Sequence, residues 1–100
     1  MIEVELQIPA DANGDSVVTV VEKVCSMYGL ICVVKGTLAS YPGCIHWHYK
    51  EGKQKGILEI TWWESESRLW VKVAKGRIGE WMDEALPKLK QEIEVSLKET

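Results

Sequence analysis

Three side chains suited to metal binding and proton transfer lie near the middle of the sequence. His46 and His48 flank Trp47, so on a strand both imidazoles point to one face, roughly 7 Å apart along the chain. Two neutral imidazoles at this spacing can bind one Zn²⁺, and a catalytic zinc site needs a third protein ligand. The candidates for that ligand are Glu59, expected across from His48, and Cys44, two residues before His46.

The same residues also have an explanation that involves no metal. The pattern His-x-His is short and common, and Lys35 and Lys72 would flank the ion with positive charge. A cross-strand pair of His48 with Glu59 would satisfy one ring, and a threonine on a neighbouring strand would satisfy His46. The sequence favours this pairing, and we predict no metal and no cofactor.

An enzyme built on His48 as a base, oriented by Glu59, is chemically reasonable. The sequence contains no nucleophile elbow and no phosphate-binding loop. We therefore assign no catalytic residue, and a small-ligand or zinc-dependent enzyme centred on His46, His48 and Glu59 stays an alternative.

These residues are expected on strands of one domain spanning residues 1–100. Apolar residues alternate with polar ones in the first segment, as in a half-buried strand, and recur at helical spacing in two others. The expected elements are a strand over 2–8, a helix near 16–28, strands over 30–39, 43–50, 56–64 and 67–74, and a helical stretch over 77–98. Pro87 interrupts this last stretch, either as a kink in one helix or as the start of a second helix. The order β-α-β-β-β-β-α predicts a two-layer α+β fold, a five-stranded antiparallel sheet with two helices on one face.

Hairpin loop lengths then set which residues stand opposite one another. The expected pairings are Lys50 with Ile57, Trp63 with Arg68, and Ala39 with Cys44. In this register Lys35 stands beside His48 on the helix-free face, and Gly36 inside its strand indicates a bulge or a bend.

The aromatic composition is unusual, with five Trp, three Tyr and no Phe. The register sends Trp47 and Trp62 into the core, where Trp81 joins them from the second helix. Trp63 and Trp70 point to the helix-free face. Two outward indoles with a polar rim are typical of an interaction site.

We therefore predict a non-enzymatic interaction module, which forms a homodimer or binds a protein partner through the helix-free face, with Trp63 and Trp70 as anchors. The other residues expected at this surface are His46, His48, Glu59, Lys35, Arg68 and Lys72. In the alternative without a partner, the two indoles lie flat beneath Arg68 and lysine stems.

A second alternative is single-stranded nucleic-acid binding, with Trp63 and Trp70 as stacking platforms. Residues 35–77 carry eight basic and four acidic side chains, a net +4, whereas the remainder carries four and eleven, a net −7. The total of −3, and Glu3 and Glu5 on the same face, disfavour a nucleic-acid partner.

The element order resembles the half-domain of the TATA-binding-protein-like fold and, more loosely, the helix-grip folds. This resemblance covers the whole chain but concerns topology, and the DNA-contacting pattern of the TATA-binding protein is missing. The strings GTLxxYPGxxHWHxK, from Gly36 to Lys50, and GILEITWW, from Gly56 to Trp63, are similar to a group of small uncharacterised bacterial proteins. That similarity implies a fold and no activity.

Composition indicates the class and compartment. With 46% hydrophobic and 27% charged residues the chain is typical of soluble globular proteins. The N-terminus lacks a signal peptide's basic and apolar regions, and no apolar run approaches the roughly 18 residues needed to span a bilayer. Three cysteines without CxxC spacing, Cys25, Cys32 and Cys44, suit reduced thiols. We expect a cytoplasmic protein with no membrane partner.

Overall fold

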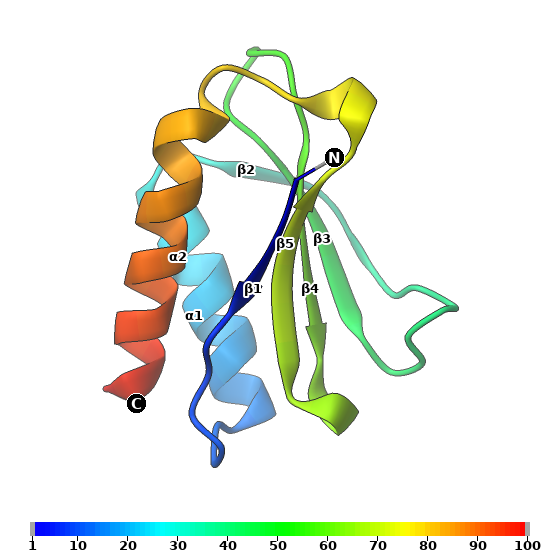
Figure 1. Cartoon of the computed structure of the whole chain (residues 1–100), viewed down its shortest axis with the longest axis vertical. Helices are drawn as coiled ribbons and strands as arrows, with labels where there is room; N and C mark the ends of the chain where they lie inside the picture. The colour runs from blue at the N-terminus through cyan, green and yellow to red at the C-terminus, as the bar shows by residue number, and fades with distance from the viewer. Residues whose placement is uncertain (1, 100) are drawn as a thin grey trace.

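The computed structural model describes residues 2–99 and shows an antiparallel sheet covered on one face by two helices (Figure 1). The elements are β1 (Ile2–Leu6), α1 (Gly14–Met27), β2 (Ile31–Gly36), β3 (Ile45–Lys50), β4 (Leu58–Trp63), β5 (Arg68–Val73) and α2 (Met82–Lys98), with short 3₁₀ turns at Glu64–Glu66 and Lys75–Arg77. The strands are ordered β1-β5-β4-β3-β2. The expected α+β class, element order and single-sided helical layer are confirmed.

Local signals explain the ends of α1. The Asn13 side chain accepts hydrogen bonds from the backbone N–H groups of Asp15 and Ser16, which caps the helix one residue before Gly14. At the other end Gly29 adopts a positive φ of 76°, and its N–H donates to the Ser26 carbonyl. A left-handed glycine at this place ends the helix and turns the chain into β2.

Helix α2 begins at Met82, five residues later than expected. Residues 77–81 contain the end of a 3₁₀ turn, the extended Ile78 and a turn at 80–81 instead, and Ile78, which the helical stripe placed inside, is exposed. Pro87 lies within α2, which continues unbroken to Lys98. Of the two expected effects of Pro87, the division into two helices is therefore wrong, and a kink within one helix stays a prediction.

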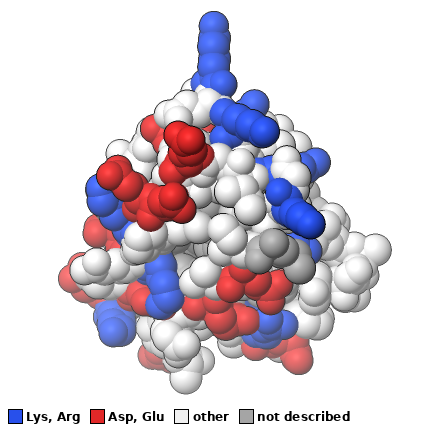
Figure 2. Space-filling view, turned by 45° about the horizontal axis from the view of Figure 1, so that its top comes forward, with Lys and Arg blue, Asp and Glu red and all other residues white. Residues whose placement is uncertain are grey.

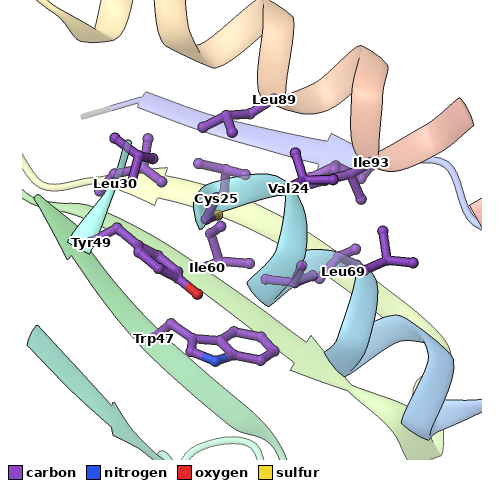
Figure 3. Packing of buried hydrophobic residues seen from close by; sticks show 14 of the residues in the cluster. Val24, Cys25, Leu30, Trp47, Tyr49, Ile60, Leu69, Leu89 and Ile93 are labelled. Carbon is purple, nitrogen blue, oxygen red and sulfur yellow. The ribbon is translucent and has the colours of Figure 1, made fainter. Parts of the chain in front are cut away.

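The core lies between the helices and the inner face of the sheet (Figure 3). Leu89 and Ile93 from α2 meet Val24 from α1 above Ile60 and Trp47 of the sheet, and all five are almost completely buried. Of the five tryptophans, the three expected in the core are indeed buried there: Trp47, Trp62 and Trp81.

A bulge alters the register at the edge of the sheet. Strands β3, β4 and β5 pair as expected, with His48 opposite Glu59 and Trp63 opposite Arg68. Between Cys32 and Val34, however, the pairing of β2 with β3 shifts by one residue. As a result every residue of β2 beyond the bulge faces the side opposite to the one expected.

The same edge strand is shorter than expected. Strand β2 ends at Gly36, and residues 37–44 form a loop held by hydrogen bonds from Tyr41 N to Leu38 O and from Cys44 N to Tyr41 O. The expected pair of Ala39 with Cys44 therefore does not form as a strand pair. Gly36 ends the strand, and the bulge lies earlier, next to Val33.

We predict that Gly79→Ala destabilises the protein and that Gly76→Ala does not. A Cβ at Gly79 would collide with the Lys55 carbonyl oxygen and press on the Trp81 indole nitrogen, whereas a Cβ at Gly76 meets nothing within 4 Å. Backbone crowding of this kind costs about 2–3 kcal/mol. Urea unfolding of both variants measures the difference. Equal free energies of unfolding would contradict the prediction, because the backbone around Gly79 would then shift without cost.

Glu94 links the end of β1 to α2 and gives stability a pH dependence. Burial raises the pKa of Glu94, but hydrogen bonds from Gln7 N and Lys90 Nζ, both 2.7 Å long, outweigh burial and keep this pKa below its usual value. A lowered carboxyl pKa stabilises the fold above the unfolded-state pKa, and this stabilisation is lost as pH falls through the folded-state pKa.

We therefore expect Glu94→Gln to lower the free energy of unfolding by about 1 kcal/mol at pH 7 and to flatten its decline below roughly pH 4.5. Urea titrations at a series of pH values measure both effects. Exposed Glu66 supplies the control, Glu66→Gln, which should leave the curve unchanged. If the free energy of unfolding of Glu94→Gln falls with pH in parallel with that of the wild type, Glu94 is not the source of the pH dependence.

Candidate metal centre

Three ligand atoms converge on the helix-free face of the sheet. His46 Nε2 lies 3.0 Å from His48 Nε2 and 3.3 Å from Glu59 Oε1, and His48 Nε2 lies 3.8 Å from the same oxygen. Within residues 2–99, these side chains form the one group of three or more His, Cys, Asp or Glu residues with mutually adjacent ligand atoms. The third ligand suggested by the sequence is thus Glu59.

The sheet itself positions these side chains. His46 and His48 are two residues apart on β3, so both face the helix-free side, and Glu59 stands directly opposite His48 on β4. His46 is buried, and its Nδ1 lies 2.8 Å from Oγ1 of Thr61, its cross-strand partner, which is also buried. When Nδ1 carries the proton and donates to this hydroxyl, the lone pair of Nε2 points away from Thr61 and accepts a hydrogen bond from His48 Nε2–H, which a metal ion would replace.

The electrostatic surroundings favour a neutral His46. Burial lowers the pKa of His46, the neighbouring His48 and Lys72 lower it further, and Glu59 opposes them. A neutral imidazole is the form that binds metal. Side-chain exposures of 8% for His46, 20% for His48 and 15% for Glu59 place the cluster partly below the surface but within reach of solvent.

Lys35 is not where the sequence placed it. The bulge in β2 puts Lys35 opposite Trp47, on the helix-facing side, where its Nζ lies 2.7 Å from Glu22 Oε2 of α1. Val34 takes the expected place beside His48. Only Lys72, across from Glu59 on β5, keeps its expected position. Of the two lysines whose positive charge was expected to disfavour a metal ion, Lys35 is therefore absent from this face.

Cys44, the other suggested ligand, does not join the cluster. Its buried sulfur accepts a hydrogen bond from Leu38 N at 3.3 Å and contacts Thr37 Oγ1 at 3.7 Å. The thiol therefore fixes the loop that follows β2, and it does not approach the ligand atoms of His46 and His48.

Trp63 and Trp70 lie on the helix-free side as expected, but they do not form an open apolar patch. Tyr41, from the loop after β2, packs edge-on against both indoles, with ring centroids 5.0 Å apart in each pair. Arg68 lies 4.5 Å from the Trp70 ring centroid and binds Glu5 at 2.7 Å. Trp70 is consequently only 4% exposed, so its expected exposure was wrong, and it lies under Arg68 as in the alternative without a partner, whereas Trp63 is half-buried.

The loop also uses the remaining polar group of Trp63. The Nε1–H of Trp63 donates to the Pro42 carbonyl at 3.0 Å. Sequence reasoning missed Tyr41 and Pro42 because it extended the strand through residue 39. The string Ser-Tyr-Pro-Gly predicts a turn at this place, but it does not indicate that the turn packs against the indoles.

Comparison of the chain with protein-family models, with curated proteins and with solved structures gave no match. The resemblance to the TATA-binding-protein-like fold accordingly stays a prediction. Among the described helices, neither combines the length and the apolar character needed to cross a membrane.

Proposed function

We propose that this chain is a zinc-binding protein whose site, formed by His46, His48 and Glu59, keeps one coordination position open for a small ligand. The observation that carries this proposal is the convergence of the three ligand atoms on one point. Two imidazoles and one carboxylate are the protein ligands of one type of catalytic zinc site, which leaves the fourth position to water or substrate.

The separations of the ligand atoms fit such an ion. A tetrahedral zinc with bonds of about 2.1 Å holds its ligand atoms about 3.4 Å apart. The three separations here are 3.0, 3.3 and 3.8 Å, and a common point roughly 2.1 Å from all three atoms exists above their plane. Zinc also ranks above iron and manganese for nitrogen and oxygen ligands of this kind.

The supporting groups favour a reactive site over a purely structural one. Structural zinc has four protein ligands, whereas residues 2–99 provide three here. Thr61 orients His46 through Nδ1, as partners of zinc-bound imidazoles do. A water molecule on the fourth position would be acidified by the ion, and Lys72 on the same face would favour an anionic substrate.

Competition with a chromophoric chelator tests the proposal on protein purified without a histidine tag. We expect one zinc per chain, and binding that weakens as pH falls from 7 to 5 because both imidazoles must lose their protons. Zinc bound at less than a tenth of an equivalent would overturn the proposal. Binding of several equivalents with unchanged affinity at pH 5 would also overturn it, because exposed carboxylates would then be the ligands.

The prediction that Trp63 and Trp70 anchor a partner remains, with a smaller exposed surface than expected because Tyr41 and Arg68 cover Trp70.

Single-stranded nucleic-acid binding also remains a prediction, and the burial of Trp70 likewise leaves less indole surface for a base to stack on. On the face in Figure 2, basic side chains gather towards the top, and acidic ones interrupt them to the left and below. On this face the mixed distribution does not favour strong phosphate binding.

A further inference from the structure

Most of the exposed large hydrophobic residues of the described chain lie in one segment, at an edge of the sheet. Strand β2 is one of the two edge strands, and all six of its residues are exposed. Ile31, Val33 and Val34 on this strand are 55%, 47% and 48% exposed. Just before it, Met27 and Tyr28 at the end of α1 are 63% and 38% exposed. Five of the seven exposed large hydrophobic residues therefore lie within residues 27–34.

The opposite edge of the sheet is protected in a way that β2 is not. Strand β1 carries Glu3 and Glu5 on the helix-free side, and Gln7, just after it, is tied to Glu94 of α2. Charges on an edge strand and a covering helix discourage pairing with another chain. On β2 the one charge is that of Lys35, which Glu22 neutralises within the same chain. The unpaired edge of β2 thus offers an apolar strand without a repelling charge.

We propose that two copies of the chain associate through β2, running antiparallel across a two-fold axis near Val33, to form one continuous ten-stranded sheet. An antiparallel pair of identical strands is two-fold symmetric, so one contact satisfies both copies and closes the assembly. The free edges of the dimer are then its two β1 strands, whose glutamates oppose further growth.

The position of Lys35, the one charged residue of β2, suits this arrangement. With the axis near Val33, Ile31 of one copy lies opposite Val34 of the other, both on the helix-free face, so the two copies of Lys35, on the helix-facing side, do not meet. On the helix side, a hollow of about 240 Å³ borders β2 and is lined by Leu30, Cys32 and Tyr49 together with polar residues of α1. In the paired arrangement the second copy's Cys32, which also faces the helix side, lies beside this hollow.

The expected contact is small. Six strand residues and the end of α1 offer on the order of 500 Å² per chain, so the pair buries about 1,000 Å² in total, which is the lower limit for a specific interface. The bulge between Cys32 and Val34 also interrupts regular pairing. We therefore expect a reversible dimer with a dissociation constant on the order of 10 μM.

Sedimentation velocity under reducing conditions, from about 2 to about 500 μM, covers this range. The wild type should shift from monomer to dimer, and Val33→Lys should stay monomeric at every concentration because two lysines would meet near the axis. Val95→Lys is the matched control, since Val95 is 42% exposed on α2, away from β2, and it should dimerise like the wild type. Trp63→Ala should also dimerise, which separates this edge from the helix-free face.

Hydrogen exchange of the wild type provides a second measurement that depends on no variant. Amides of residues 31–36 should become more protected, by at least about tenfold, between the lowest and the highest concentration, while those of β1 should not change. A wild type that is monomeric at 500 μM would overturn the proposal. So would a Val33→Lys variant that dimerises like Val95→Lys, or a concentration-dependent protection that falls outside β2.

Discussion

Replacing His48 by Ala should weaken zinc binding by more than about 100-fold, because it removes one of only three protein ligands. Glu59→Gln should have a similar effect, since a neutral amide is a poor zinc ligand beside a carboxylate. Thr61→Val keeps the shape of the side chain but removes the hydroxyl next to His46 Nδ1, so we expect a smaller loss of about 10- to 100-fold. Isothermal titration calorimetry of the three variants measures this order.

The matched control for these variants is Glu3→Gln. Glu3 lies in the same row of the sheet as Glu59, beyond Lys72, and is not part of the ligand cluster. The substitution removes one negative charge from the same face and should change the affinity by less than about threefold. If Glu3→Gln and Glu59→Gln weaken zinc equally, the ion is held by the general charge of the face and not by the three ligands.

Trp47→Ala should have the largest effect on stability, about 3–5 kcal/mol. Trp47 has no exposed surface and packs beneath α1 (Figure 3). Its Nε1–H donates to Glu22 Oε2 at 3.0 Å. A domain of this size has a total stability of about 5–15 kcal/mol, so the variant should be close to unfolding at room temperature. Urea unfolding followed by circular dichroism measures the loss.

Two further variants separate the contributions at this position. Trp47→Phe keeps most of the buried ring and loses the hydrogen bond to Glu22, and we expect a cost of about 1–2 kcal/mol. Trp63→Ala removes an indole that is only partly buried and should cost about 1–2 kcal/mol. A cost for Trp47→Ala no greater than that for Trp63→Ala would contradict the division of the tryptophans between core and surface.

Most of the sheet could be predicted from the sequence because its hairpins are short and its central strands alternate clearly. The pairs of His48 with Glu59 and of Trp63 with Arg68 follow from the loop lengths, and both are present. Strand β2 gave no such signal. In Ile-Cys-Val-Val every side chain is apolar, so nothing indicates which residues face the helices, and a bulge moves Lys35 to the other side without changing the pattern.

The candidate site was predicted as a set of residues but not as a geometry. Strand parity places His46, His48 and Glu59 on one face, and the distances between their ligand atoms depend on side-chain rotamers that Thr61 and the neighbouring strands fix. The burial of Trp70 could not be predicted either, because it depends on how the loop that contains Tyr41 packs against the sheet. Such contacts arise between segments that are distant in the sequence.

A crystal structure of the zinc-loaded protein, with anomalous diffraction recorded at the zinc absorption edge, tests the central claim most directly. The account predicts one anomalous peak per chain, about 2.0–2.2 Å from His46 Nε2, His48 Nε2 and a carboxylate oxygen of Glu59, with a non-protein ligand completing the tetrahedron. A loaded crystal without a peak at this place, in which the two Nε2 atoms remain in contact at about 3.0 Å, would contradict the account.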